Sequence, residues 1–164
     1  MLDRHRVEYV IVGGVAGNLH GASRPTGDLD ALPRATRENL DRVAQALREL
    51  GAFLRVGRMT DDEARRLPVV VDATMLAQAQ ITTWRTDAGD LDIMHSLPDR
   101  DGRHVEYEEL AGRAREITMD TGIVVRVAAL EDVIASKQWA NRPKDHEALS
   151  ELLELKQSED GMSP

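Results

Sequence analysis

The segment from Val12 to Asp30 constrains the fold of this 164-residue chain more than any other part of the sequence. A β-branched apolar run over residues 8–12 ends at Gly13-Gly14, the pattern of a buried strand that stops where the backbone comes close to another group. Because the two glycines lack side chains, their N–H groups can face a ligand, and the following helix N-terminus favours an anion such as phosphate. Many Gly-Gly pairs are only tight strand-to-helix turns, so the pair alone does not decide between the two interpretations.

Two aspartates strengthen the first interpretation. Asp28 and Asp30 lie two residues apart, so in a strand both project to one face while Leu29 points to the other. Adjacent carboxylates repel each other unless a cation lies between them. Mg²⁺ (or Mn²⁺) binds one or two protein carboxylates together with phosphate oxygens, and a pair of such ions can stabilise an in-line displacement. The pair therefore predicts a metal site, and the alternative is a solvated edge strand or an acidic turn.

A third carboxylate lies downstream, in residues 88–94. Leu91 and Ile93 alternate with Asp90 and Asp92, which predicts a second strand with its acidic residues on one face. Asp92 lies inside the apolar run, where an unpaired charge is costly, whereas Asp90 is nearer the turn and can simply cap it. We therefore expect Asp92 to be the third metal ligand.

This arrangement resembles the nucleotidyltransferase superfamily of the DNA polymerase beta type. The residues that carry the resemblance are Gly13, Gly14, Gly21, Arg24, Thr26, Asp28, Asp30 and Asp92. Within the superfamily the chain is most similar to the AbiEii-like nucleotidyltransferases of type IV toxin–antitoxin systems and their bacterial relatives. Those proteins carry Gly-Gly where minimal nucleotidyltransferases, typically antitoxins paired with HEPN ribonucleases, carry Gly-Ser. Gly14 therefore favours the first branch.

The resemblance extends through residues 127–137 and 141–145. It implies a basic residue near the nucleoside triphosphate (NTP) and a Lys-Asp pair at the start of the next helix, and these roles are carried onto Lys137, Lys144 and Asp145. Lys144 would contact phosphate and Asp145 would orient it.

Each of the polar residues around the carboxylates also has a purely structural interpretation. Lys137 lies on an apolar helical face, from which it either extends to solvent or reaches a negative site. Arg24 can bind phosphate and Thr26 can fix the turn before the carboxylate strand, but both are equally explained as loop anchors. Lys144 and Asp145 are equally explained as a helix-capping arrangement.

The rest of the pattern predicts an α+β (α/β) fold in which helices flank a mixed twisted sheet of the polymerase-beta type, with a helical C-terminal part. Besides the elements above, we expect helices over 37–50, 105–114, 130–140 and 143–155, strands over 52–56, 69–71, 79–86, 117–119 and 123–127, and a loop or short helix over 57–68. We expect a nucleotidyltransferase core over 1–127, a helical part of the same domain over 128–157, and a flexible tail over 158–164.

The composition of the chain excludes several classes of chemistry and of binding partner. The absence of cysteine excludes disulfides and thiol chemistry, and the absence of a long apolar run or a signal segment predicts a cytoplasmic protein with no membrane partner. A net charge of −8 argues against broad binding to duplex DNA, and an aromatic content of 3% provides few surfaces on which single-stranded bases stack.

The resemblance implies a Mg²⁺-dependent nucleotidyltransferase that moves a nucleoside monophosphate from an NTP to a hydroxyl acceptor. Asp28, Asp30 and Asp92 would hold the metal, with Asp92 also helping to deprotonate the acceptor. The implied acceptor is a tRNA 3′ end, which would make the chain a toxin with a separately encoded antitoxin protein. The alternatives are protein AMPylation, nucleotidylation of a small molecule such as an aminoglycoside, or a degenerate module that only binds nucleotide or protein.

Overall fold

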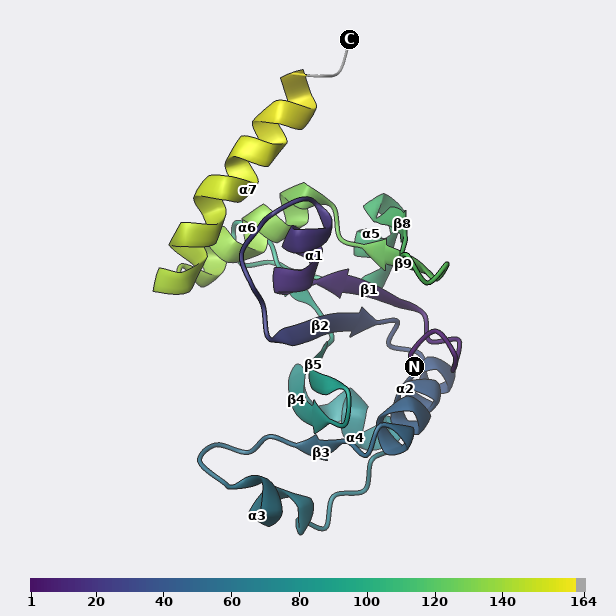
Figure 1. The fold of residues 1–164 in the computed structure, drawn as a ribbon. Coiled ribbons are helices and arrows are strands. Elements are labelled where there is room, and N and C mark those ends of the chain that lie inside the picture. The colour runs from purple at the N-terminus through teal and green to yellow at the C-terminus, as the bar shows by residue number, and fades with distance from the viewer. Residues whose placement is uncertain (162–164) are drawn as a thin grey trace.

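The computed structural model describes residues 1–161, in which seven strands form one mixed sheet with helices on both sides (Figure 1). The strand order across the sheet is β3 (Phe53–Leu54), β4 (Ile81–Thr86), β5 (Gly89–Met94), β2 (Asp28–Pro33), β1 (Tyr9–Val12), β9 (Val124–Val127) and β8 (Arg115–Thr118). β2 is antiparallel to β1 and parallel to β5, while β1 is parallel to β9. A separate hairpin pairs β6 (Leu97–Pro98) with β7 (His104–Val105). The predicted mixed sheet is confirmed.

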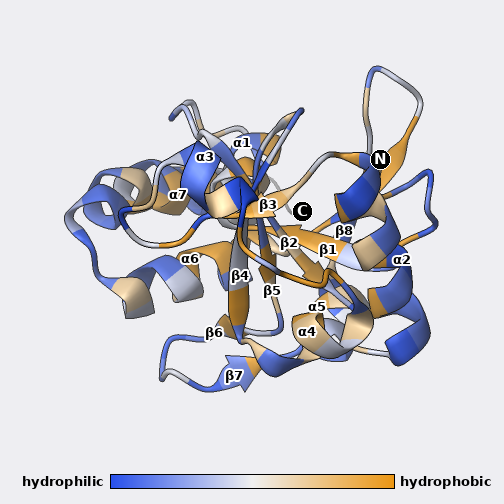
Figure 2. Ribbon diagram, turned by 90° about the horizontal axis from the view of Figure 1, so that it is seen from below, coloured by the Kyte–Doolittle hydropathy of each residue, from blue (hydrophilic) through white to orange (hydrophobic). Residues whose placement is uncertain are grey.

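Apart from the short helix α3 (Asp61–Arg65), the described helices divide into two groups that bury two apolar clusters. The described helices are α1 (Gly13–Leu19), α2 (Arg37–Glu49), α3 (Asp61–Arg65), α4 (Ala73–Gln78), α5 (Tyr107–Arg113), α6 (Leu130–Ala140) and α7 (Pro143–Gly161). One cluster joins β1 and β9 to α1, α5, α6 and α7, and the other joins β2, β4 and β5 to α2 and α4. Figure 2 shows hydrophobic residues concentrated in central strands such as β1, β2 and β4, with hydrophilic residues on the outer faces of the helices. Burial of these strands holds the β2–β5 pair in place.

The predicted helix after Thr36 is confirmed as α2. The Thr36 side chain accepts a hydrogen bond from the Asn39 N–H at 3.3 Å, which caps the helix. Asn39 is only 1% exposed, and its amide bonds the backbone N–H and C=O of Glu8 and the C=O of Arg34. These bonds satisfy a buried polar side chain and fix α2 against the strands that carry the site.

Residues 69–71 were predicted as a strand and are not one. Val70 is 71% exposed, and the segment leads into α4, whose N-terminus is capped by the Asp72 carboxylate accepting from the Met75 N–H at 2.8 Å. Three valines favour an extended chain, but these residues pair with none of the described strands, so they form no ladder. Residues 57–68 contain the short helix α3, one of the two predicted outcomes.

Two helix boundaries also differ from the prediction. The helix expected over 105–114 begins at Tyr107, because Val105 pairs in β7 instead. The last helix, expected to end at residue 155, continues to Gly161 and so includes part of the predicted flexible tail. No proline or glycine interrupts residues 156–160, so nothing in the sequence stops the helix there. The rest of the predicted tail, 162–164, lies outside the described residues.

No helix within the described part of the chain has both the length and the hydrophobicity needed to cross a membrane.

Candidate active site

Strand register brings the predicted carboxylates together. In the parallel β2–β5 pair, Asp30 lies opposite Asp92 and Asp28 lies opposite Asp90. Because side chains alternate along a strand, all four project from the same face of the sheet. Residues more than 60 positions apart in the sequence therefore meet on adjacent strands, as the alternating patterns predicted.

Burial and the grouped negative charges together raise the pKa of two of these carboxyls. Burial, together with the negative charges of Asp28 and Asp92, raises the pKa of Asp30 to about 6, although the Gly14 backbone hydrogen bond and the Lys137 charge act in the opposite direction. Burial also raises the pKa of Asp92, against a hydrogen bond from Thr83. One oxygen of Asp92, Oδ1, is buried and has no hydrogen-bond partner. The site therefore holds negative charge that the protein itself does not fully neutralise.

These features fit a divalent cation, although the expected three-carboxylate ligand set is not preassembled. Across residues 1–161, no group of three or more His, Asp or Glu side chains is arranged as a metal cluster. Mg²⁺ does not require one, because it is commonly bound through one or two carboxylates, with substrate phosphate oxygens and waters completing the shell. The unpartnered oxygen of Asp92 and the raised pKa of Asp30 are both consistent with a cation shared between β2 and β5.

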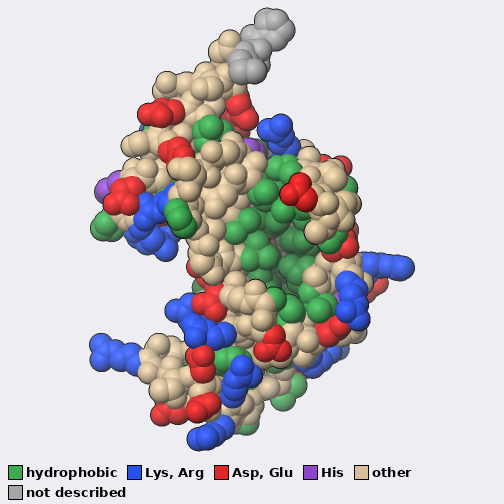
Figure 3. Space-filling view, in the orientation of Figure 1, with side chains coloured by type: hydrophobic (Ala, Val, Ile, Leu, Met, Phe, Trp, Pro, Cys, Tyr) green, Lys and Arg blue, Asp and Glu red, His purple; other side chains and the backbone are tan. Residues whose placement is uncertain are grey.

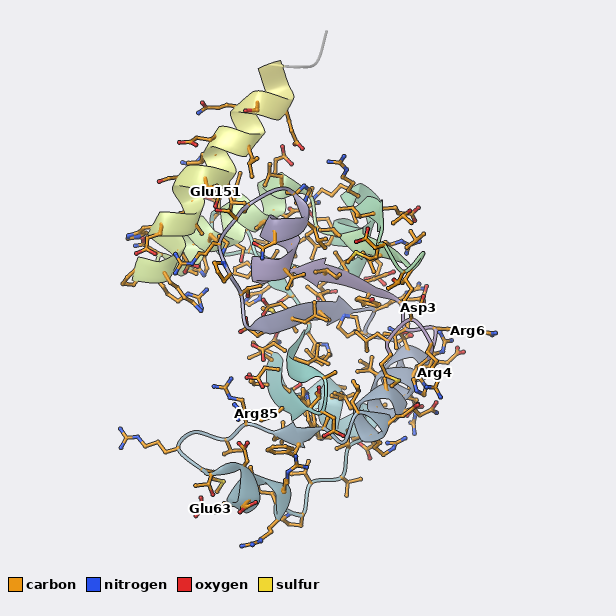
Figure 4. The ribbon with its side chains drawn as sticks, in the orientation of Figure 1. Asp3, Arg4, Arg6, Glu63, Arg85 and Glu151 are labelled. Carbon is orange, nitrogen blue, oxygen red and sulfur yellow. The ribbon has the colours of Figure 1, made fainter. Side chains whose placement is uncertain are left out.

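Asp90 differs from its neighbours because two guanidinium groups neutralise it. Its carboxylate accepts from Arg55 Nη1 at 3.0 Å and from Arg85 Nε at 3.2 Å. Arg85, labelled in Figure 4, also reaches Asp61 of α3 at 2.9 Å. The choice of Asp92 over Asp90 as the candidate ligand is consistent with this geometry, although Asp90 is held by arginines and not by the turn.

The two glycines allow α1 to begin against the carboxylate strand. Gly13 has a φ of +66°, and a Cβ there would lie 1.9 Å from Oδ2 of Asp30. A Cβ on Gly14 would lie 2.6 Å from Oγ1 of Thr26, and that hydroxyl donates to Oδ1 of Asp28 at 3.0 Å. The space beside both glycines is thus occupied by β2 and the residues before it, and their contact with a phosphate stays a prediction.

Basic residues face the carboxylates from α6 and the start of α7. Asp145 is 1% exposed and accepts from Arg142 Nε at 2.6 Å, while Lys137 Nζ lies 3.6 Å from its other oxygen. Burial disfavours the charged form, but the hydrogen bonds and charge of Arg142, together with Lys137, hold the pKa of Asp145 below its usual value. Asp145 thus pairs with Arg142 and Lys137 instead of Lys144, and the hydrogen bond it accepts from the Arg142 N–H at 3.3 Å favours the predicted capping interpretation. Adjacent helical residues point in different directions, whereas Arg142 and Asp145, three apart, share a face.

Arg24 is anchored outside the carboxylate group. Its guanidinium forms an ion pair with Glu147 of α7, and the N–H of Ser23 donates to Glu151 at 2.7 Å. Figure 4 labels Glu151 where α7 passes the loop before β2. The contacts join this loop to α7 and agree with the loop-anchor interpretation.

The residues predicted for the site line one cavity of about 370 Å³. The ten predicted site residues that line it are Gly13, Gly14, Arg24, Thr26, Asp28, Asp30, Asp92, Lys137, Lys144 and Asp145. Sequence reasoning did not select Arg142, Ser136 or Asn18, which also line it. Figure 3 shows a hollow between the start of α7 and the α3 segment, with Lys and Arg side chains on both of its sides. A volume of this size suits a small-molecule ligand.

No known family model and no curated protein matches the chain, but solved structures do. Its structure is similar to that of the lincosamide antibiotic adenylyltransferase LnuA with lincomycin bound, with a TM-score of 0.56 and 14% sequence identity over 94% of this chain and 90% of that one. The chain has a nucleotidyltransferase fold. It is also similar to ANT(2″)-Ia in complex with adenylyl-2″-tobramycin, with a TM-score of 0.53 and 18% identity over 95% of this chain and 88% of that one. The predicted fold class is thus confirmed, and the AbiEii-like subtype stays a prediction.

Proposed function

We propose that this chain is an enzyme that transfers a nucleoside monophosphate from an NTP to a hydroxyl acceptor, with Mg²⁺ or Mn²⁺ as cofactor. The observation that carries the proposal is the register of β2 and β5, which sets Asp30 beside Asp92 in a cavity that also contains Asp28, Lys137 and Arg142. Acidic residues for a cation and basic residues for phosphates, in one cavity, are what phosphoryl transfer requires.

Each side chain has a separate role in this mechanism. Asp28 and Asp30 hold the cation, which when bound supplies Lewis-acid stabilisation of phosphoryl oxygens. Asp92, whose pKa is raised and whose Oδ1 lacks a partner, completes the ligand set and accepts the proton of the acceptor hydroxyl. Lys137 and Arg142, held by Asp145, neutralise the triphosphate as charge moves to the leaving pyrophosphate.

Four further residues complete the nucleotide site in this proposal. Lys144 forms no ion pair within the described part of the chain, so its charge is available to a phosphate. Arg24 assists from the loop before β2, while Gly13 and Gly14 let the start of α1 lie against the carboxylates.

The acceptor proposed first is a tRNA 3′ end, as the resemblance to AbiEii-like proteins implies, with the chain acting as a cytoplasmic toxin beside a separate antitoxin protein. A small hydroxyl compound is the second candidate. It is favoured by the two structural neighbours, because one was solved with lincomycin and the other with adenylyl-2″-tobramycin.

A label-transfer experiment tests the function and separates the acceptors. The chain is incubated with each α-³²P-labelled NTP, with Mg²⁺ or Mn²⁺, and with total tRNA, cellular protein, a lincosamide or an aminoglycoside. We expect labelled tRNA, and labelled antibiotic would favour the second candidate. Asp28→Asn and Asp30→Asn should abolish transfer, whereas Asp120→Asn, in an exposed turn, should not. No transfer under any condition would leave a binding module and contradict the proposal.

A further inference from the structure

The cavity has an apolar end that the proposed chemistry does not use. Ile81, Met94, Leu97 and Val133 line it, and we call these four residues the apolar wall. Ile81 is a large aliphatic residue with 48% of its surface exposed, whereas Leu97 and Val133 are 4% and 1% exposed. An exposed isoleucine at the side of a cavity, next to buried aliphatic residues, forms a surface suited to an apolar group of a ligand.

The apolar wall continues directly from the carboxylates. Met94 follows Asp92 by two residues in β5 and so projects from the same face, and Ile81 of β4 lies opposite Met94 in the antiparallel pair. Leu97 begins β6 just beyond β5. One continuous strip of the cavity therefore changes from charged to apolar within a few residues.

Helix α6 closes the other side of this strip and sets its distance from the phosphate-binding residues. Val133 precedes Lys137 by four residues, so both lie on one face of α6, one turn or about 6 Å apart. Both line the cavity. A triphosphate in contact with Lys137 would thus have its nucleoside next to the apolar wall when the molecule extends along α6 toward its N-terminus.

We propose that the apolar wall is the nucleobase subsite of the proposed nucleotidyltransferase. It binds the base mainly through apolar contacts and forms few hydrogen bonds with the polar edge of the base. This proposal rests on the proposed function. Of the uncharged hydrogen-bonding side chains that line the cavity, Ser136 lies three residues from Val133 on α6, while Thr26 and Asn18 belong to the loop before β2 and to α1. Sites that discriminate strongly do so through several buried hydrogen bonds, whereas apolar pockets discriminate by about 10- to 200-fold at most.

The test compares ligands with and without a base on matched variants. Ile81→Ser removes an exposed part of the wall, and Val124→Ser, on a 53% exposed residue of β9 outside the cavity, is the control. Calorimetric titration with ATP and with inorganic tripolyphosphate, both with Mg²⁺, measures the two affinities. We expect Ile81→Ser to weaken ATP binding about 3- to 10-fold and to leave tripolyphosphate binding unchanged, while Val124→Ser changes neither.

Other outcomes would overturn the proposal in distinguishable ways. If Ile81→Ser lowers label transfer but not ATP affinity, the wall belongs to the acceptor. If it weakens ATP and tripolyphosphate equally, the wall does not contact the base. For the unaltered chain we expect Kd values for ATP, GTP, CTP and UTP within about tenfold of each other, and a preference of more than about a thousandfold for one base would contradict recognition by apolar contact. Failure of the unaltered chain to bind either ATP or tripolyphosphate would instead overturn the proposed function itself.

Discussion

Gly13 and Asp30 are so close that a methyl group on the glycine would lie 1.9 Å from Oδ2 of the aspartate. Oδ2 belongs to the carboxyl whose pKa is raised to about 6, and the same contact joins the start of α1 to β2. The position therefore links the stability of the fold to the placement of a proposed metal ligand.

Gly13→Ala tests this link, with Gly122→Ala as its control. Both glycines have positive φ, +66° and +80°, so both alanines are strained, but Gly122 has no atom within 4 Å of the added Cβ. We expect the control to lose about 1 kcal/mol of unfolding free energy and Gly13→Ala to lose at least about 2 kcal/mol more, because Asp30 must move. Urea unfolding measures both. Equal losses would show that only backbone strain matters at position 13.

Asp30→Asn should stabilise the metal-free protein while abolishing the proposed transfer. The folded-state pKa of about 6 lies above the ordinary value of 3.8, so the folded state binds this proton more tightly than the unfolded state does. Stability is therefore lost as the pH rises from about 4 to about 6 and is not regained above it. At about 1.4 kcal/mol per pKa unit, the ionised carboxylate costs about 2 to 3 kcal/mol at pH 8.

Unfolding of Asp30→Asn in EDTA over a pH series checks the sign. We expect its gain over the unaltered chain to be largest at pH 8 and to shrink toward pH 4, while Asp120→Asn shows no such trend. A variant that is less stable at pH 8 would mean that Lys137 and the Gly14 N–H already compensate the charge of Asp30.

The local alternation of apolar and acidic residues was sufficient to predict the part of the site that lies on strands. Alternation in residues 28–30 and 90–94 fixes which face each aspartate occupies, and the apolar neighbours of Asp92 favoured it over Asp90. Both conclusions depend only on residues within a few positions, which is why they could be reached without the structure.

Pairing between separate elements could not be predicted in the same way. Whether Asp145 would also lie beside Lys137 depends on how α6 and α7 cross, and Glu147 as the partner of Arg24 depends on where α7 passes the loop before β2. The prediction of a strand over residues 69–71 was wrong for a related reason, because β propensity does not show whether a neighbouring strand is present.

Asp145→Asn should destabilise the protein and weaken NTP binding together. The substitution leaves Arg142 and Lys137 without their buried counter-charge, which typically costs about 3 kcal/mol, and somewhat less here because the Arg142 side chain is 56% exposed. Glu159→Gln is the control, since Glu159 pairs with Arg115 at 3.5 Å in an exposed position. Because the pKa of Asp145 is lowered, its contribution is present above pH 4 and is lost as the pH falls through its folded-state value.

Guanidinium chloride unfolding at pH 7 and pH 3 and tripolyphosphate titration provide the two measurements for Asp145→Asn. We expect a smaller difference from the unaltered chain at pH 3 and at least a fivefold weaker affinity at pH 7. If Asp145→Asn lowers the stability but leaves the affinity for tripolyphosphate unchanged, Asp145 has only a helix-capping role.

The role of Arg24 can be determined by separating its ion pair with Glu147 from its proposed contact with phosphate. The ion pair with Glu147 is exposed, 39% and 75% for the two side chains, and such pairs contribute about 0 to 1 kcal/mol. We therefore expect Arg24→Ala and Glu147→Ala to change the unfolding free energy equally little. If Arg24 also contacts phosphate, Arg24→Ala weakens tripolyphosphate binding several-fold, whereas Glu147→Ala leaves it unchanged or tightens it because the guanidinium is released. Equal weakening in both variants would show that Arg24 acts only by holding its loop against α7, since then the ion pair and not the free charge would matter to the ligand.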